Sequence, residues 1–493
     1  MGTIRSQNGT QNIISGDNRG YVYDDGQTIK RVTYDADSNH SEYIYSLYQK
    51  YALNSFGVVG TSLEQDVLSH QKLPITYPHE WPPALFKDAV LFHLHLLLQL
   101  NRYGLTLKDA MPENILFTGT TPAFVDFFSL LPADELDNEQ WLKDYCPKGL
   151  DLRLHVLERM FVPYMLIPLL MYAAGRYDKG QRLLKNCYCN NCRGEVAGWD
   201  ALRHLISPSK KKLLKMALSA ERLPRLAAFW KMREIHKLCG EKFDISWEDR
   251  LRELIRHIST LDLMPPLSGY TDYYAAKGED AGLGDPESWN GKQREVAGVL
   301  SKYAPKTVLD LGANTGWYSL LAARMGAYVT ALDIDLSCID TLYRTAKTSF
   351  PGSICPLWMS FDDLTAEHYS LDASGQTNEN PLHMAATRRL NSDVVLCLAL
   401  MHHLTLGLGL GLEKVLEVLF ALTKRVLVLE FTDLDDPLIV ADPSFFPNLA
   451  QWNADSYSRE AVQNIALKSG FTCTVAPSTP AETRCLLILE KHE

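Results

Sequence analysis

The chain has 493 residues, of which 46% are hydrophobic and 22% charged, values that predict a globular protein of two or three domains. Its 49 basic and 59 acidic residues give a formal net charge of −10. Proteins that bind duplex nucleic acid usually carry a basic face, so this balance argues against a nucleic-acid partner.

No targeting or membrane-spanning segment is expected. The first residues, MGTIRSQNGTQN, are polar and lack the apolar core of a secretory signal. The longest apolar runs, residues 90–100 and 161–174, are shorter than the roughly 20 residues that cross a bilayer. The ten cysteines lack the spacing of a disulfide scaffold, which is typical of a reducing compartment. We therefore expect a cytoplasmic protein without a membrane partner.

Residues 1–75 are expected to form a small lobe with a β-hairpin and a helix. Polar and apolar side chains alternate over residues 20–34 around Asp24-Asp25-Gly26, which is a hairpin signal. A helical stretch follows from about residue 41 to residue 53. The proline-rich residues 77–83 then predict a rigid connector, and the apolar run after them predicts a helix over residues 84–103.

Residues 76–262 are expected to be mainly helical, with two short strands at residues 115–117 and 123–126. Three cysteines in this part, Cys187, Cys189 and Cys192, have a spacing that zinc can use, with Cys239 or His236 as a fourth ligand. No second Cys-x-x-Cys pair accompanies them, and the flanking Asn and Gly residues are typical of a loop. Free thiols on a surface loop are therefore the preferred interpretation, and no metal is expected.

A kinase-like motif lies between these elements. Asp109 and Asn114 have D-x4-N spacing, and Asp126 follows in Val-Asp-Phe-Phe. In kinases an Asp and an Asn with this spacing supply the base and a metal ligand, and the later Asp holds a metal ion. The stretch resembles the C-lobe of aminoglycoside-phosphotransferase-like kinases, which implies an α+β kinase-like first half.

The sequence departs from that kinase pattern at three places. Leu107-Lys108 stands where a His is expected, Phe127 is not followed by Gly, and no glycine-rich phosphate loop precedes Lys30, the nearest candidate for the strand lysine. We therefore expect a degenerate kinase-like scaffold that organises or presents a substrate. An active phosphotransferase and a chance similarity are the alternatives.

After a linker at residues 263–290, the sequence predicts an α/β domain over residues 291–493. Apolar strands alternate with helical segments there, which indicates a parallel sheet with helices on both faces. The last strands are expected to form an antiparallel hairpin at the sheet edge. The predicted strands are residues 307–311, 328–333, 356–361, 394–398, 426–431 and 485–489.

A glycine-rich turn, Asp310-Leu311-Gly312-Ala313-Asn314-Thr315-Gly316, follows the first of these strands and opens a helix. Ligands of such sheets lie at the carboxyl ends of the strands. Asn314 stands where a dinucleotide site has its second glycine, which disfavours a pyrophosphate. Asp333 lies 21 residues after Gly312, the usual offset of an acid that binds ribose hydroxyls. Asp362 or Asp363, after the next strand, is a candidate for binding an adenine amino group.

Residues 308–316 resemble motif I of class I S-adenosylmethionine-dependent methyltransferases, and Asp333 matches the second acidic motif of that superfamily. Residues 397–404, Cys-Leu-Ala-Leu-Met-His-His-Leu, resemble the fourth-strand segment that lies beside the sulfonium. The resemblance implies a Rossmann-like sheet and S-adenosylmethionine as cofactor. The expected cofactor-binding residues are Asp310, Gly312, Asn314, Gly316, Asp333 and Asp362.

His402 and His403 are the candidate catalytic residues, because a histidine beside the sulfonium is suited to take the acceptor's proton at neutral pH. On an extended segment only one of two neighbours reaches the pocket, and alternation favours His402. In the alternative, both histidines pack to hold the loop. Glu430 and Asp433 are candidates for the pocket border and, equally, for capping or solvent-facing acids.

The expected reaction is methyl transfer to an O or N of a small-molecule or natural-product acceptor, and a protein acceptor stays open. The segment at residues 400–403 lacks the Asn/Asp-Pro-Pro-Tyr loop of enzymes that methylate nucleobases or glutamine amides. Two other functions remain open. One is aminocarboxypropyl transfer or cyclisation with the same cofactor, and the other is a kinase-like binding protein in which the methyltransferase domain is ancillary.

Overall fold

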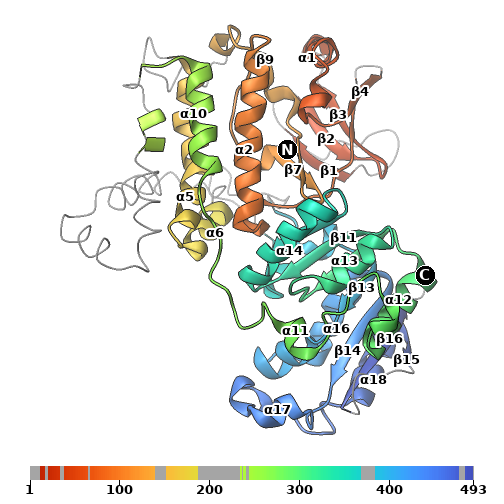
Figure 1. Cartoon of the computed structure of the whole chain (residues 1–493). Coiled ribbons are helices and arrows are strands. Elements are labelled where there is room, and N and C mark those ends of the chain that lie inside the picture. The colour runs from red at the N-terminus through yellow and green to blue at the C-terminus, as the bar shows by residue number, and fades with distance from the viewer. Residues whose placement is uncertain are drawn as a thin grey trace, which may run out of the picture.

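The computed structural model describes residues 12–16, 20–33, 38–64, 67–138, 151–186, 234–235, 237–239, 244–367, 383–476 and 483–491. These residues form two halves, which lie one above the other in Figure 1. The cysteine cluster Cys187, Cys189 and Cys192 and the candidate ligand His236 lie outside the described residues, whereas Cys239 is a buried free thiol. Within the described ranges no three His, Cys, Asp or Glu side chains are grouped to hold a metal ion.

The first half begins with a five-stranded antiparallel sheet in the order β1-β2-β3-β5-β4. The predicted hairpin is confirmed, because β2 and β3 pair with Tyr21 opposite Val32. The Asp25 carboxylate closes its turn by accepting the N–H groups of Gln27 and Thr28. The elements are β1 (Asn12–Gly16), β2 (Gly20–Asp24), β3 (Thr28–Thr33), α1 (Ser38–Lys50), η2 (Leu53–Phe56), β4 (Thr61–Glu64) and β5 (Val67–Gln71).

Helices and two short hairpins make up the rest of the first half. Helix α2 (Pro83–Asn101) lies at its centre, between the sheet on one side and α5 and α10 on the other (Figure 1), and an apolar surface on nearly all sides suits that position. The hairpin β7–β8 and the pair β6–β9 carry the kinase-like motif between them. The remaining elements are η3 (Pro78–Glu80), β6 (Leu105–Leu107), η4 (Pro112–Asn114), β7 (Ile115–Thr118), β8 (Thr121–Phe124), η5 (Phe127–Ser129), β9 (Leu130–Pro132), η6 (Leu136–Asn138), α4 (Leu152–Val156), the π-helix η7 (Leu157–Leu166), α5 (Ile167–Ala173), α6 (Tyr177–Asn186) and α10 (Trp247–Ser259).

One continuous helical span among the described residues, Leu152–Ala173, is long and apolar enough to cross a membrane. It is longer than the apolar run at residues 161–174 because α4 and the start of η7 continue the same helical path. Within its most apolar stretch 72% of the residues are buried inside the protein, as in the core helix of a globular fold.

The second half is a seven-stranded sheet in the order β12-β11-β10-β13-β14-β16-β15. All neighbouring strands are parallel except β16, which runs antiparallel to both β14 and β15. The strand order changes direction between β10 and β13, which leaves a topological switch point at their carboxyl ends. The strands are β10 (Thr307–Leu311), β11 (Tyr328–Asp333), β12 (Ile354–Trp358), β13 (Ser392–Cys397), β14 (Thr423–Thr432), β15 (Phe471–Val475) and β16 (Arg484–Lys491).

The predicted α/β class, the parallel sheet and the final antiparallel hairpin are therefore confirmed. The sheet is accompanied by α11 (Tyr273–Lys277), η10 (Pro286–Ser288), α12 (Gly291–Tyr303), α13 (Trp317–Arg324), α14 (Leu336–Ser349), η11 (Asp362–Leu364), α15 (Ala386–Arg389), the π-helix η12 (His403–Gly407), α16 (Leu412–Leu422), α17 (Pro437–Ala441), η13 (Pro443–Phe445), η14 (Leu449–Gln451) and α18 (Arg459–Lys468).

Two strand ends differ from the prediction, and both bear on the site. Strand β12 ends at Trp358 and not at residue 361, because Ser360 turns back to donate its N–H and hydroxyl to Asp363. Strand β13 ends at Cys397, and Ala399 follows with a left-handed φ of 49°. The Ala399 N–H donates to a carboxylate oxygen of Glu430 at 3.0 Å, which holds this turn in place.

Candidate active site

The glycine turn lies at the carboxyl end of β10. Gly312 and Gly316 have φ values of 70° and 87°, in the left-handed region that glycine adopts without strain. At Gly316 a Cβ atom would lie 2.3 Å from the Leu342 side chain, so glycine is required for α13 to begin against α14. Asn314 also has a positive φ, of 52°. The turn is therefore a rigid backbone cradle at the switch point of the sheet.

The two predicted acids border this cradle. One oxygen of Asp333 accepts the N–H of Asn314 at 2.7 Å and the other accepts the N–H of Asp335 at 2.7 Å. Asp310 is buried and accepts the Ser319 hydroxyl at 2.6 Å. Burial raises the pKa of each carboxyl to about 6, and for Asp310 the nearby charge of Asp333 adds to the effect. The sequence-predicted residues of β10 and β11 thus lie together.

The acids after β12 lie differently from one another. Asp362 is exposed, and its assignment to adenine stays a prediction. Asp363 accepts the N–H and the hydroxyl of Ser360, and its other oxygen lies 2.9 Å from the Lys185 ammonium. Asp363 therefore shapes the turn that ends β12 and is already bonded within the protein.

A segment that the sequence assigned to the linker covers the glycine turn. The Asn314 amide donates to the carbonyl of Tyr270 at 2.9 Å, and the Tyr274 hydroxyl lies 3.4 Å from the carbonyl of Ala313. Thr271 makes a hydrogen bond to Ser337, at the start of α14. The sequence carries no local signal for this cover, because Tyr270 and Tyr274 stand 40 and 36 residues before Asp310.

A buried ionic network lies beside the cradle. Glu430, on β14, is fully buried and accepts the Lys292 ammonium at 2.8 Å. Arg484, on β16, lies 3.5 Å from Glu430 and donates to Asp436 at 2.8 Å. Burial lowers the pKa of Lys292, but the carboxylates of Glu430 and Glu279 outweigh it, so its pKa is raised and the ammonium stays charged. Glu430 was a candidate for the pocket border, and Lys292 and Arg484 were missed because charged residues are common on helix and strand ends.

Several buried polar atoms around this network have no hydrogen-bond partner among the described residues. They are the Tyr318 hydroxyl and Nδ1 of His402, together with one oxygen each of Glu279 and Glu430. The Glu279 oxygen nevertheless faces the Lys292 ammonium at 3.8 Å, and the Glu430 oxygen faces Arg484 at 3.5 Å. The Lys292 ammonium lies 5.6 Å from the Tyr318 ring. Buried polar atoms are rarely left unpaired, so the Tyr318 hydroxyl and Nδ1 of His402 are candidates for contact with a polar ligand.

His402 and His403 do not lie on an extended segment, and that expectation is wrong. After the Ala399 turn the chain becomes helical at Met401, so the alternation argument fails. The two rings lie 4.3 Å apart, and both contact Phe446, at 5.8 and 5.7 Å. Burial lowers the pKa of both, for His402 well below 6.5 with further effects from His403 and Arg484. Both rings are therefore neutral at pH 7.

The kinase-like residues of the first half also meet. The Asn114 amide donates to Asp109 at 2.6 Å and lies 3.5 Å from Asp126. Burial and the charge of Asp126 raise the pKa of Asp109 to about 7. In an active kinase the strand lysine pairs with an acid of the helix that follows. Here Lys30 donates to Ser69 on β5, and Glu42, the acid of α1, is exposed.

The strand order, with one reversed strand next to the last and a glycine turn after the first, is the topology of class I S-adenosylmethionine-dependent methyltransferases. The second half has a class I methyltransferase fold. No protein-family model matches the chain. Over 398 residues it is 25% identical to the nodulation protein NoeA of Rhizobium meliloti (strain 1021). The aligned region covers 76% of this chain and 72% of NoeA.

Similarities to solved methyltransferase structures are weaker. Magnesium protoporphyrin IX methyltransferase (ChlM) of Synechocystis PCC 6803, with bound SAH, is 16% identical, covers 45% of this chain and 97% of its own, and has a TM-score of 0.29. The bifunctional kinase-methyltransferase WbdD is 16% identical over 43% of this chain and 42% of its own, also with a TM-score of 0.29. The assignment of the methyltransferase fold therefore rests on the strand order of the sheet and not on these structural similarities.

Proposed function

We propose that this chain binds S-adenosylmethionine at the glycine turn and transfers its methyl group to an O or N of a small-molecule acceptor. The observation that carries the proposal is the pairing of Asp333 with the Asn314 N–H at the switch point of the sheet. In the proposed mode the amino-acid end of the cofactor lies at the turn after β10 and the ribose at Asp333. The base then extends toward the turn that ends β12, the next strand of the sheet.

When bound, the cofactor supplies an electrophilic methyl group on a sulfonium. The protein's part in such a displacement is to align the acceptor and exclude water. Tyr270 and Tyr274 hydrogen-bond to the glycine turn and would close over a cofactor bound there. The Lys292–Glu430 pair and Tyr318 supply polar contacts beside the cradle, where an acceptor hydroxyl or amine would be oriented.

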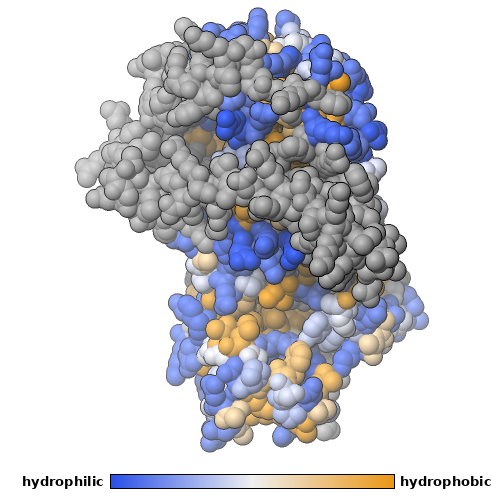
Figure 2. Space-filling view, turned by 90° about the vertical axis from the view of Figure 1, so that its left-hand side faces the viewer, coloured by the Kyte–Doolittle hydropathy of each residue, from blue (hydrophilic) through white to orange (hydrophobic). Residues whose placement is uncertain are grey.

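The entrance of the proposed acceptor site is apolar. Figure 2 shows apolar residues gathered around a hollow in the lower half, on the face that includes α17. Exposed apolar side chains of this part of the chain are Leu438, Val440 and Phe445, and the Phe445 ring lies 5.8 Å from that of His403. We propose an acceptor with an apolar body and one polar end, which is compatible with a natural product and less so with nucleic acid.

For the first half we propose a kinase-like scaffold that does not transfer phosphate, with lobes at residues 1–75 and 76–262, a linker at 263–290 and the methyltransferase domain at 291–493. The exposed Glu42 supports this reading, because an active kinase pairs that helix acid with the strand lysine. A protein acceptor, presented by the scaffold, is the second candidate substrate.

Product analysis tests the methyl-transfer proposal. The full chain is incubated with S-adenosylmethionine labelled in its methyl group and with a metabolite extract, and the products are identified by mass spectrometry. We expect S-adenosylhomocysteine together with a labelled acceptor. Formation of methylthioadenosine would instead identify aminocarboxypropyl transfer, and failure of the chain to bind S-adenosylhomocysteine would contradict the cofactor assignment itself.

A further inference from the structure

The edge strand of the methyltransferase sheet, β12, lies against the first half of the chain. At its amino end the β7–β8 hairpin touches the preceding turn, where Thr120 donates its N–H to the Pro351 carbonyl at 2.7 Å. A Cβ atom on Gly119 would lie 2.4 Å from the same carbonyl oxygen, so only glycine permits this approach of the two backbones. An edge strand with unpaired backbone groups is thereby covered from within the chain.

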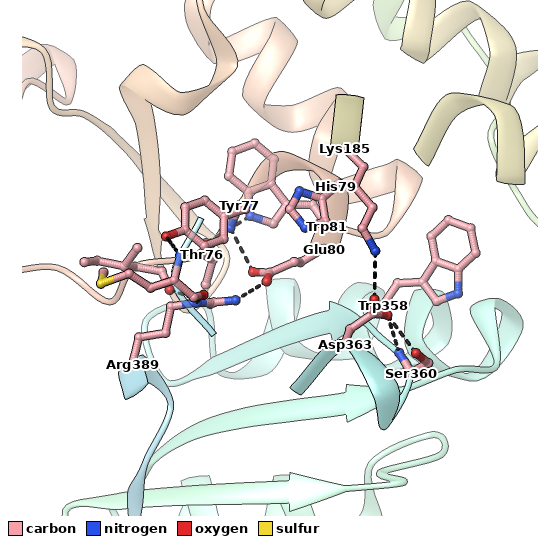
Figure 3. A network of polar contacts seen from close by, with 12 residues as sticks. Thr76, Tyr77, His79, Glu80, Trp81, Lys185, Trp358, Ser360, Asp363 and Arg389 are labelled. Atoms are coloured by element: carbon pink, nitrogen blue, oxygen red, sulfur yellow. Dashed lines mark hydrogen bonds and ion pairs between the residues drawn. The ribbon is translucent and has the colours of Figure 1, made fainter. Parts of the chain in front are cut away.

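At its carboxyl end residues 75–81, which include most of the predicted connector at residues 77–83, continue the contact (Figure 3). Arg389 forms a buried ion pair with Glu80, donates to the carbonyl of Ile75 at 2.8 Å and lies with its guanidinium 4.6 Å from the Tyr77 ring. The Tyr77 hydroxyl accepts the N–H of Met384 at 2.9 Å. A stretch that the sequence predicts only as a rigid connector is thus a docking surface for the second half.

Helix α6 of the first half holds the turn after β12 directly (Figure 3). The Lys185 ammonium lies 2.9 Å from one oxygen of Asp363, and the other oxygen of Asp363 binds the N–H and hydroxyl of Ser360. One turn earlier, the Gln181 amide lies within hydrogen-bond distance of the Trp358 carbonyl, at 3.3 Å. Burial raises the pKa of Asp363, but Lys185 and Ser360 outweigh this and lower it, so the carboxylate is charged at pH 7.

A small pocket, partly open to solvent, lies at this junction between the halves. Its charged lining residues are bonded to one another, Lys185 to Asp363 and Arg389 to Glu80. Both ion pairs connect the two halves. The pair of Lys185 with Asp363 joins the turn after β12 to helix α6 of the first half.

We infer that Lys185 and Gln181, on the kinase-like half, are positioning residues for the adenine end of the cofactor. This inference rests on the proposed function, which places the base beside the turn that ends β12. Through Asp363, Lys185 fixes Ser360, and Gln181 fixes Trp358. The first half thereby sets the affinity of the methyltransferase domain for its cofactor, and any ligand that moves α6 changes that affinity.

Calorimetry on the full chain tests this inference with S-adenosylhomocysteine and methylthioadenosine, which share the adenosine part. The Lys185–Asp363 pair is about one-third exposed on both sides, so Lys185→Met should weaken both ligands by about two- to fivefold and by the same factor. Lys185→Arg should restore the affinity. The double variant Gln181→Leu/Lys185→Met should weaken both ligands further.

Lys347→Met is the matched control. Lys347 on α14 pairs with Asp88 on α2 and so also joins the two halves, but near the amino end of β12. Its removal should leave both affinities unchanged even where the melting temperature falls. Equal affinities for Lys185→Met and wild type would overturn the inference, as would a loss confined to S-adenosylhomocysteine. Absence of binding to the wild type would instead contradict the proposed function.

Discussion

The carboxylate of Asp333 accepts the backbone N–H of Asn314 at 2.7 Å, so the acid that ends β11 is fixed to the turn that follows β10. Its second oxygen is oriented by the N–H of Asp335. Asp333→Ala removes this oriented acceptor and should weaken S-adenosylhomocysteine binding by about 1–3 kcal/mol, the scale of charge-assisted hydrogen bonds. Calorimetry of the full chain measures the change.

Asp393→Ala provides the control for this substitution. Asp393 also accepts two backbone N–H groups, those of Lys306 and Thr307, but at the amino end of the same sheet. Its loss should lower stability and leave the ligand affinity unchanged. If Asp393→Ala weakened the ligand as much as Asp333→Ala, the effect would be one of folding and the ribose assignment would fail.

The affinity for S-adenosylhomocysteine should depend on pH. Burial raises the pKa of Asp310 and Asp333 to about 6, and a bound ammonium and ribose favour their charged forms. The affinity should be constant above pH 7 and should fall as the pH drops through 6, by up to about tenfold per pH unit for each carboxyl that must ionise. The ligand's own ammonium and carboxylate do not titrate in this range. Titrations from pH 5 to pH 8 give the profile, and equal affinity at pH 5 and pH 7 would contradict it.

The cofactor cradle is predictable from sequence because its determinants are local. A positive φ at Gly312 and Gly316 requires glycine, and the length of one helix and one strand sets the offset to Asp333. The hairpin of β2 and β3 is predictable for the same reason, since its turn is closed by Asp25 within three residues.

The rest of the site depends on contacts between residues far apart in the chain. The strand that leads to His402 stops early because Ala399 donates to Glu430 on a neighbouring strand. Tyr270 covers Asn314 from a stretch with the composition of a linker. Arg389 looks like an ordinary charged residue in the sequence, and only the fold brings it to Glu80. Such pairings leave no local pattern to detect.

Removal of Lys292 should destabilise the protein strongly. Lys292 and Glu430 are both almost fully buried, and breaking such a pair leaves an uncompensated buried charge. Lys292→Met should lower the free energy of unfolding by about 3–5 kcal/mol, measured by urea denaturation. Lys302 lies on the same helix and pairs with Glu490 on the surface, so Lys302→Met should lower it by less than about 1 kcal/mol. Similar losses for both variants would show that the buried pair has no special role.

ATP with magnesium should not stabilise the full chain. The cluster of Asp109, Asn114 and Asp126 is assembled, but Lys30 is bonded to Ser69 and lies 3.7 Å from Asp25. Addition of ATP and magnesium should therefore leave the melting temperature of the wild type unchanged, and likewise that of Asp126→Ala. A rise in melting temperature for the wild type alone would show that the first half binds nucleotide, and the degenerate-kinase proposal would be wrong.

His402 should make stability depend on pH below neutrality. Burial, with His403 and Arg484, lowers its pKa well below 6.5, whereas the unfolded chain titrates near 6.5. The unfolded state therefore binds the proton first, so the stabilisation by neutral His402 is complete above pH 6.5 and is lost as the pH falls below that value. Between pH 7 and pH 5 the wild type should lose more free energy of unfolding than His402→Gln.

The same variant separates a catalytic from a packing role once an acceptor is known. As a base, His402 is already neutral at pH 7, so His402→Gln should lower kcat at least about tenfold with S-adenosylhomocysteine affinity unchanged. The pH profile of the wild type should then show an apparent pKa below 6.5, shifted by burial from the value of a free histidine. His403→Gln, which keeps the neighbouring His402, should retain most of the turnover. If both variants retain full turnover, the two rings act only by packing against Phe446, and the proton leaves by another route.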